Sequence, residues 1–331
     1  MRHPYFSLSQ LFNFLRAEAG PHRPVCGHQP TSVCLFMTGK CNLKCEWCYR
    51  NTNESLTTTG NMSLAAAGKI LAVFPKATHL ILAGFGEPLL APDVFKIASV
   101  FSARPMRVSL ISNGLLLYDR AKELLSSGVR SISISLNAPD AASYVKVCGA
   151  QPRDFDRVLA GVREIVKHER RKRPILRISS VVSRENIART EELIRLAEDL
   201  GVDSLDLHSL IVYSQAADSS QLLAASEQSV LQQLELLKKK KYGISINWPE
   251  PVAKLSRPSS ACSELWSWIG VDAEGNTAGC QKAMGPSPVY GNIFTDGGEV
   301  WNNKYRTDMR NAFLKREFLC DCCKICSEVQ P

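Results

Sequence analysis

Residues 33–49 read VCLFMTGKCNLKCEWCY, a short apolar run followed at once by three closely spaced cysteines. The run Val33–Thr38 has the length and composition of a buried strand. Cys41, Cys45 and Cys48 come next, with the spacing C-x3-C-x2-C. The stretch therefore predicts a strand whose carboxyl end opens into a loop carrying three thiols.

The sequence beyond this stretch alternates short apolar runs with stretches of helical periodicity. Further strands are expected at His79–Ala83, Arg107–Ser112, Ser131–Leu136, Ile175–Val182 and Ser204–Leu210. Helices are expected near Ser63–Phe74, Asp93–Phe101, Asp119–Ser126, Phe155–Glu169 and Ala188–Leu200. About six β/α repeats predict an α/β fold with a parallel sheet covered by helices. Active sites in such barrels lie at the carboxyl ends of the strands, where the three cysteines are placed.

Four regions are expected along the chain. Residues 1–31 form an N-terminal extension with a short amphipathic helix, and residues 32–212 form the β/α core. After Leu210 the repeat fails, and residues 213–258 read as a helical connector with a long helix at Gln221–Lys240 and a short strand at Ile244–Asn247. Residues 259–331 form a small C-terminal domain. It is expected to contain a hairpin (Trp266–Val271 with Asn276–Cys280) and a helix near Glu299–Arg316.

Composition narrows the possible classes of protein. The chain has 331 residues, of which 45% are hydrophobic and 22% charged, and a formal net charge of +8. No apolar run is long enough to cross a membrane and no secretory leader is evident, so we expect a cytoplasmic protein. A basic surface favours an acidic flavodoxin or ferredoxin as reductant. Nucleic acid is a weaker alternative, because basic and aromatic residues are not interleaved.

Twelve cysteines are many for such a chain, and seven of them lie in two tight groups. Without a secretory leader a disulfide framework is not expected, and metal binding becomes the leading interpretation. Three thiolates on one loop can hold three corners of a [4Fe–4S] cluster and leave the fourth iron open, whereas zinc sites favour paired C-x2-C elements. A zinc loop and three incidental thiols remain the alternatives.

Cys41, Cys45 and Cys48, with the aromatic Tyr49 directly after them, closely resemble the motif of the radical S-adenosylmethionine (SAM) superfamily. The resemblance implies a partial (β/α)6 barrel. It also implies a [4Fe–4S] cluster whose open iron chelates SAM, and reductive cleavage of SAM to a 5′-deoxyadenosyl radical that abstracts a hydrogen atom from substrate. It extends over residues 32–212.

The same resemblance implies SAM-binding residues at the strand ends. Gly84-Phe-Gly86-Glu87 resembles the Gly-Gly-Glu motif of the family, with Phe85 in place of the middle glycine. Ser112 and Asn113 end the third strand like its Thr-Asn-Gly. The full set of cofactor-binding residues implied is Tyr49, Gly84, Gly86, Glu87, Ser112, Asn113, Ser135, Asn137 and Arg177.

The C-terminal cysteines resemble a SPASM/twitch domain, which implies one auxiliary [4Fe–4S] cluster. Cys262, Cys280, Cys323 and Cys326 are the favoured ligands, with Cys320 in reserve, and a zinc ribbon on the same four residues is the alternative. Cys26, Cys34 and Cys148 are expected to be structural, as buried cysteines usually are. Cys148 is also a candidate hydrogen-atom donor, since epimerases of the family use a thiol.

The leading functional hypothesis is an oxidoreductase that dehydrogenates a small, polar natural-product intermediate such as a sugar, an aminocyclitol or a nucleoside. The alternatives are a peptide maturase, an epimerase, and a non-enzymatic iron–sulfur electron-transfer protein. The N-terminal extension is shorter than the peptide-recognition domain that maturases often carry, which counts against the first of these. The electron-transfer protein predicts clusters without SAM cleavage.

Overall fold

A computed structural model of the chain describes residues 6–20, 22–52, 60–210, 219–252, 262–281, 284–318, 323, 324 and 326. Its centre is an eight-stranded sheet of order β7-β6-β5-β4-β3-β2-β1-β8. Every neighbouring pair in that sheet is parallel. The strands are β1 Ser32–Phe36, β2 His79–Ala83, β3 Arg107–Ser112, β4 Ser131–Ser135, β5 Ile175–Val182, β6 Ser204–Ser209, β7 Ser245–Asn247 and β8 Trp268–Val271.

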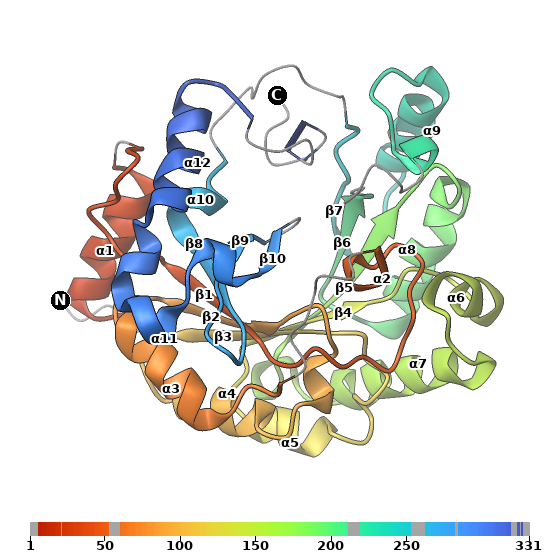
Figure 1. The fold of residues 1–331 in the computed structure, drawn as a ribbon. Coiled ribbons are helices and arrows are strands. Elements are labelled where there is room, and N and C mark those ends of the chain that lie inside the picture. The colour runs from red at the N-terminus through yellow and green to blue at the C-terminus, as the bar shows by residue number, and fades with distance from the viewer. Residues whose placement is uncertain are drawn as a thin grey trace.

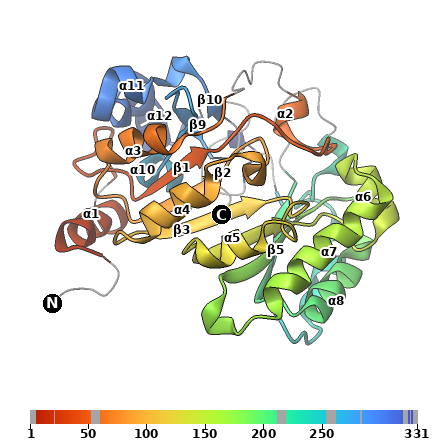
Figure 2. The same cartoon turned by 90° about the horizontal axis from the view of Figure 1, so that it is seen from below.

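Helices cover one face of this sheet, as Figures 1 and 2 show. They are α3 Leu64–Val73, α4 Val94–Ser102, α5 Ala121–Ser126, α6 Ala141–Cys148, α7 Pro152–Val166 and α8 Thr190–Leu200. In the described part of the chain the edge strands β7 and β8 do not pair with each other, so the sheet is an open, partial barrel. The expected α/β fold of this type is confirmed.

Side-chain alternation decides which face of the sheet the helices cover. In β4, Ile132 and Ile134 are fully buried, whereas Ser131, Ser133 and Ser135 are only half-buried. Successive side chains of a strand point to opposite faces, so the isoleucines pack beneath the helices and the serines line the other face. Along β4 the face that the helices leave uncovered is therefore polar, whereas on β1, β2 and β8 an apolar cluster that includes Phe36, Ile81 and Trp268 lies on the same face.

Local sequence fixes where these helices begin and end. Asp140 caps α6 by accepting hydrogen bonds from the backbone N–H groups of Ala142 and Ser143, at 2.9 and 3.0 Å. The helix ends at Gly149, whose φ of 58° lies in the left-handed region that glycine tolerates best. Helix α6 was not predicted. It is short, and it lies between the predicted strand that ends near Ser135 and a strongly amphipathic helix.

Two expectations for the second half of the chain are wrong in part. The β/α repeat does not stop after Leu210, because α9 (Gln228–Lys238) leads to β7, which pairs in parallel with β6. Strand β8 is not one arm of a simple hairpin, since it pairs in parallel with β1. Only a single antiparallel bridge joins Val271 to Thr277, and β9 (Ala278–Cys280) pairs instead with β10 (Met284–Pro286). All four residues of β8 are buried, as suits a strand covered on both faces.

The remaining elements surround the sheet. The α-helices are α1 Leu8–Glu18, α2 Tyr49–Thr52, α10 Glu264–Ser267, α11 Ile293–Asp296 and α12 Lys304–Leu314. Single 3-10 turns occur at Pro88–Leu90, Arg170–Lys172, Ile187–Arg189, Ser219–Gln221, Pro288–Tyr290 and Gly297–Trp301. Helices α10 and α12 lie beside β8, at one edge of the sheet (Figure 1). Within the described residues, no helix has the length and apolar character needed to cross a bilayer.

Candidate active site

The three predicted cluster cysteines share one loop directly after β1. This segment, residues 37–48, is called the cysteine loop below. Cys41, Cys45 and Cys48 are each half-buried. The loop is fastened to the end of α6, because the backbone N–H groups of Lys44 and Glu46 donate to the carbonyls of Cys148 (3.1 Å) and Val147 (2.9 Å). It is therefore held at the carboxyl ends of the central strands.

The charges on this loop show that the thiols are close neighbours. Burial raises the pKa of the Cys41 thiol, and negative charge on Glu87, Cys45 and Cys48 raises it further, against a hydrogen bond from the Leu43 backbone. Three such thiolates fit the corners of an iron–sulfur cluster, whose positive irons would relieve this repulsion. Among the described residues no three acidic, cysteine or histidine side chains are close enough to hold one metal ion. A cubane cluster does not require that, since each thiolate binds a different iron.

The Gly-x-Gly-Glu segment after β2 is packed against the cysteine loop. A Cβ atom at Gly86 would lie 2.2 Å from the carbonyl oxygen of Thr38 and 2.5 Å from that of Lys40, so only glycine fits. The next residue, Glu87, donates its backbone N–H to the Lys40 carbonyl at 2.8 Å. Gly84 has a φ of 135° and faces Phe36. In the structure these glycines allow the end of β2 to approach the loop.

The Glu87 side chain joins the ends of β2 and β3. The residue is 2% exposed. It accepts hydrogen bonds from the Leu89 N–H (2.8 Å), the Ser112 hydroxyl (2.8 Å) and the Asn113 N–H (2.7 Å). Burial raises the pKa of Glu87, while these three donors lower it. An ionised carboxylate has about four acceptor positions, so about one is left for a ligand.

Ser112 and Asn113 connect this carboxylate to the cysteine loop. The Asn113 side-chain nitrogen donates to the Asn42 side-chain oxygen at 2.7 Å and lies 3.9 Å from the sulfur of Cys41. The structure thus brings Glu87, Ser112 and Asn113, which the family resemblance implied, to the cysteine loop. Tyr49, the first residue of α2, also lies there, with its ring centroid 4.8 Å from that of Phe85. Phe85, which replaces the family's middle glycine, stacks on Phe36 and is tilted against the ring of Tyr49.

Ser135 and Asn137 lie at the end of β4. The Asn137 side-chain oxygen accepts a hydrogen bond from the backbone N–H of Val181 at 2.9 Å, which ties β4 to β5. Asn137 also lines a cavity of about 220 Å³ beside Trp47 of the cysteine loop. Ser135 is half-buried on the polar face and pairs in register with Ser179.

Arg177 lies apart from the other predicted SAM-binding residues. In the register of β4 and β5, Arg177 is opposite Ser133. The pair of Ser135 and Ser179 lies two residues further toward the carboxyl ends of these strands. The guanidinium of Arg177 is 4.0 Å from a carboxylate oxygen of Asp206. The side chain lines a pocket of about 1250 Å³ over the polar face of the sheet, toward the amino-terminal ends of the strands.

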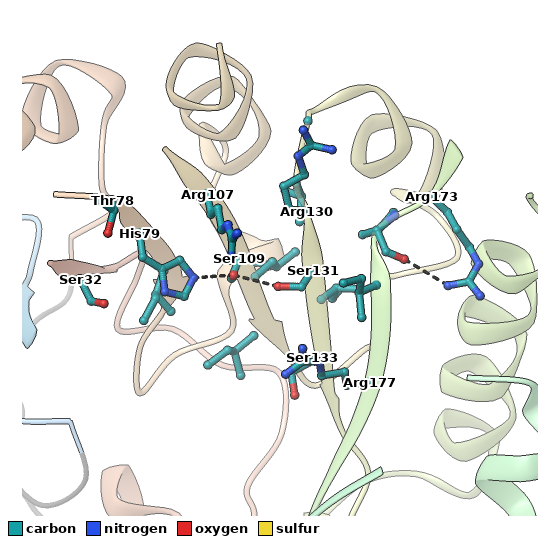
Figure 3. A pocket seen from close by; sticks show the side chains of 18 of the residues that line it. Ser32, Thr78, His79, Arg107, Ser109, Arg130, Ser131, Ser133, Arg173 and Arg177 are labelled. Atoms are coloured by element: carbon teal, nitrogen blue, oxygen red, sulfur yellow. Dashed lines mark hydrogen bonds between the residues drawn. The ribbon is translucent and has the colours of Figure 1, made fainter. Parts of the chain in front are cut away.

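This large pocket was not recognised from the sequence. Figure 3 shows His79, Ser109 and Ser131 in a row across β2, β3 and β4. The His79 Nε2 atom is 2.7 Å from the Ser109 hydroxyl, which is 2.8 Å from the Ser131 hydroxyl. Burial, and next the charge of Arg107, lowers the pKa of His79. The described residues that line this pocket include seven Lys or Arg side chains and two Asp or Glu side chains. The alternation of serine and isoleucine in residues 131–135 was the available sequence signal.

Cys148 lies beneath the cysteine loop. It is 2% exposed, and its thiol interacts with the thiol of Cys45. This interaction and burial raise the pKa of Cys148 strongly. The candidate hydrogen-atom donor is therefore a neighbour of a predicted cluster ligand.

A second group of thiols lies in the C-terminal part of the chain. Burial raises the pKa of Cys262, and charges on Cys326, Glu264 and Cys280 raise it further. Cys262, Cys280 and Cys326 are thus within electrostatic reach of one another, and Cys323 is half-buried close by in sequence. The reserve ligand Cys320 lies outside the described residues.

Comparison with known proteins agrees with this geometry. Residues 35–208 match the family model described as the Radical SAM superfamily. The AdoMet-dependent heme synthase of Methanosarcina barkeri is 29% identical over 205 residues, which cover 61% of this chain and 57% of that protein. The chain spans about half the length of several curated relatives that it matches, 51% in the case of a second heme synthase.

Two further matches extend into the C-terminal part. The PqqA peptide cyclase of Gluconobacter oxydans is 24% identical over 310 residues, covering 90% of this chain and 82% of that one. The structure of Streptococcus suis SuiB bound to its precursor peptide SuiA superposes with a TM-score of 0.66 at 14% identity, covering 91% of this chain and 72% of that one. At that identity the structural match establishes the fold alone.

Proposed function

The chain belongs to the radical SAM superfamily, and from that premise we propose that it holds a [4Fe–4S] cluster on Cys41, Cys45 and Cys48 and oxidises a small polar substrate. When bound, this cluster and SAM supply a 5′-deoxyadenosyl radical that takes a hydrogen atom from substrate, and an auxiliary cluster supplies the acceptor for the electron released as the substrate radical loses a proton. The net change in the substrate is the loss of two electrons and two protons. The observation that carries the proposal is the convergence of the cysteine loop, Glu87 and Asn113 at the carboxyl ends of β1–β3.

The roles of the chain's own residues follow from this convergence. Glu87 keeps about one acceptor position, which is suited to the ammonium group of SAM. Gly84 and Gly86 let the backbone come close to the cysteine loop. Ser112 and Asn113 orient Glu87 and the loop. Tyr49, Ser135 and Asn137 border the same region from α2 and β4 and complete the proposed SAM site.

The class of substrate is proposed from the polar face of the sheet. His79, Ser109 and Ser131 form a hydrogen-bonded row in the large pocket, toward the amino-terminal ends of the strands. Ser133, Arg177 and Ser135 continue the polar side chains from this row toward the cysteine loop, where a substrate must meet the SAM site. Hydroxyl and guanidinium groups recognise oxygen-rich ligands. A sugar, an aminocyclitol or a nucleoside carries several hydroxyl groups that can form hydrogen bonds with these side chains. Arg177 is proposed to contact the substrate, because its register places it away from the strand ends.

The auxiliary [4Fe–4S] cluster is proposed on Cys262, Cys280, Cys323 and Cys326, with Cys320 as the reserve ligand. The mutual effect of the charges on Cys262, Cys280 and Cys326 supports this ligand set. A zinc ion on the same thiols is the alternative, but it needs all of its ligands around one metal, and no three of the described side chains are that close. The +8 net charge favours an acidic flavodoxin or ferredoxin as electron donor to the SAM-binding cluster.

A peptide substrate is the second candidate. The match to the PqqA peptide cyclase, which covers 90% of this chain, favours it. Under this alternative the polar face binds backbone amides instead of hydroxyl groups.

Anaerobic reconstitution followed by iron and sulfide analysis tests the proposal first. Wild type is expected to bind about eight irons per chain, and a variant with alanine at Cys41, Cys45 and Cys48 about four. Only wild type is expected to form 5′-deoxyadenosine from SAM and dithionite. Cys34→Ala serves as the control, because Cys34 is a buried cysteine of β1 outside both groups. Two clusters without any 5′-deoxyadenosine support an electron-transfer protein instead.

The substrate class is tested by stimulation of this reaction. 5′-Deoxyadenosine formation is measured with a panel of sugars, aminocyclitols and nucleosides, and in parallel with a panel of synthetic peptides. Stimulation by the first panel alone supports a small polar substrate. Stimulation by peptides alone replaces it with the maturase.

A further inference from the structure

Helix α12 carries two arginines that are buried as completely as the hydrophobic core. Arg306 is 2% exposed and Arg310, one turn later, is 0% exposed. A guanidinium group stays charged in proteins, and buried charges are normally paired with an opposite charge. Within the described part of the chain, the hydrogen-bond partners of both groups are neutral oxygens, and neither forms an ion pair with a carboxylate.

The partners of these arginines leave part of each guanidinium unsatisfied. Arg306 donates from Nη2 to the carbonyl of Ala278 at 2.7 Å. Arg310 donates from Nε to the carbonyl of Leu265 at 2.9 Å, and its Nη1 reaches a backbone carbonyl and the Asn302 side chain. Arg306 Nε and Arg310 Nη2 are buried without a hydrogen-bond partner among the described residues. Both groups also lie over the ring of Trp301, at 5.3 and 4.6 Å. An aromatic face compensates a buried charge only in part.

The two arginines are attached to the segments that carry the predicted auxiliary ligands. Ala278 is two residues before Cys280, and Leu265 is three residues after Cys262. Negative charge on Cys280 acts on Arg306 and opposes the fall of its pKa to about 9, which burial and the charge of Arg310 cause. Arg306 is thus within electrostatic reach of Cys280 and Cys26, and Arg310 of Cys26. Hydrogen bonds tie the two arginines to the segments that carry Cys280 and Cys262.

We infer that Arg306 and Arg310 are positioning residues that supply the positive charge needed to stabilise an auxiliary [4Fe–4S] cluster bound by Cys262, Cys280, Cys323 and Cys326. This inference rests on the proposed function. Such a cluster with four thiolates carries about two negative charges when oxidised and about three when reduced. The two buried cations balance the oxidised form and attract the reduced form more strongly. They therefore raise the reduction potential, in addition to holding the Cys262 and Cys280 segments together.

The test isolates the auxiliary cluster in the full-length chain. Alanine replaces Cys41, Cys45 and Cys48, so that any remaining cluster signal belongs to the C-terminal thiols. In this background Arg306→Gln and Arg310→Gln remove one charge each and keep a hydrogen-bond donor. Arg306→Lys keeps the charge. Lys304→Gln is the matched control, because Lys304 is on the same helix but its side chain is 88% exposed.

The measurement is an anaerobic redox titration followed by electron paramagnetic resonance. At a fixed potential near the midpoint, each Arg→Gln change is expected to lower the ratio of reduced to oxidised cluster about tenfold, which corresponds to about 59 mV for one electron. Arg306→Lys and Lys304→Gln are expected to leave the ratio near that of the background chain. An unchanged ratio in both Arg→Gln variants, with about four irons bound, overturns the inference and leaves the cluster intact.

Iron content separates failure of the inference from failure of the proposed function. If the background chain itself binds no iron, the proposed auxiliary cluster is wrong and the inference falls with it. If Arg306→Gln is the only variant that fails to bind iron, the iron content of Arg306→Lys shows whether the positive charge is what the cluster requires. Recovery of the cluster with lysine supports a role for the charge. Loss with lysine as well, in a chain with an unchanged circular dichroism spectrum, shows that a positive charge at this position does not restore the cluster and overturns the inference.

Discussion

The side-chain amide of Asn113 donates a 2.7 Å hydrogen bond to the side-chain oxygen of Asn42, which joins the end of β3 to the cysteine loop. The orientation of the amide is fixed at its other end, because its oxygen accepts from the backbone N–H of Leu115 at 3.0 Å. The same nitrogen is 3.9 Å from the Cys41 sulfur, within reach of an N–H···S hydrogen bond. Asn113 therefore holds a predicted cluster ligand from outside the loop.

Asn113→Ala is expected to loosen the SAM-binding cluster without preventing its assembly. The change removes hydrogen bonds worth about 1 kcal/mol, so iron is expected to leave for a chelator roughly fivefold faster. The measurement is the rate of iron release from anaerobically reconstituted protein. Asn311→Ala, at an exposed position of α12, is the control. Equal rates in the two variants contradict this role of Asn113.

Arg177→Gln distinguishes two roles for that arginine. The family resemblance implies contact with SAM, whereas the register places Arg177 opposite Ser133, below the strand ends. We therefore expect the SAM dissociation constant to stay within about twofold of wild type and the Michaelis constant of the substrate to rise roughly tenfold, as for loss of a charged hydrogen bond. Equilibrium binding of SAM to the reconstituted protein measures the first quantity. Tenfold weaker SAM binding, with Arg171→Gln unchanged, supports the role that the resemblance implies.

Cys148→Ala tests whether this thiol returns a hydrogen atom to the substrate. Because the side chain is 2% exposed and lies against Cys45, we expect product formation to continue at a rate within a few-fold of wild type. The readouts are product and 5′-deoxyadenosine, followed together with the first compound that stimulates SAM cleavage. Continued 5′-deoxyadenosine formation without product identifies Cys148 as the hydrogen-atom donor. Cys26→Ala is the matched buried cysteine.

Strands β2, β3 and β5 have the bounds expected from the sequence, because their apolar residues recur with the period of a strand. For strand β8 only the hairpin partner was predicted, and that contact is a single bridge, whereas its main pairing is with β1. Its apolar run looks the same whether the strand forms a hairpin or is buried beside β1, and pairing with β1 spans more than two hundred residues of sequence. Such a choice between partners depends on tertiary contacts.

The candidate site was predictable to the level of residue types at strand ends. Spacing identified the cysteine loop, and the family resemblance identified Glu87 at the end of the neighbouring strand. The hydrogen bonds that Ser112 and Asn113 donate to the Glu87 carboxylate could not be predicted, because they depend on side-chain geometry that no local sequence pattern specifies.

The buried arginines of α12 were missed for a different reason. Charged residues on a helix normally indicate its solvent-exposed face, and Arg306 and Arg310 reverse that rule.

Asp272 gives a prediction for the pH dependence of stability. The residue is fully buried in the turn before β9. Its carboxylate accepts hydrogen bonds from the backbone N–H groups of Glu274 (3.0 Å) and Asn276 (2.8 Å). Burial outweighs these bonds and raises the pKa of Asp272 to about 6. A raised carboxyl pKa means that the folded state holds the proton more tightly than the unfolded state does.

The stability that this proton contributes is complete below the unfolded pKa of about 4 and is lost as the pH rises through about 6. Between about pH 4 and pH 7 we therefore expect wild type to lose roughly 2–3 kcal/mol of unfolding free energy relative to Asp272→Asn. Urea denaturation of both chains across this range measures the difference, and the comparison cancels the titration of the other carboxyl groups. A difference that is constant with pH shows that the pKa of Asp272 is the same in the folded and unfolded states. In that case the hydrogen bonds that it accepts from Glu274 and Asn276 offset burial.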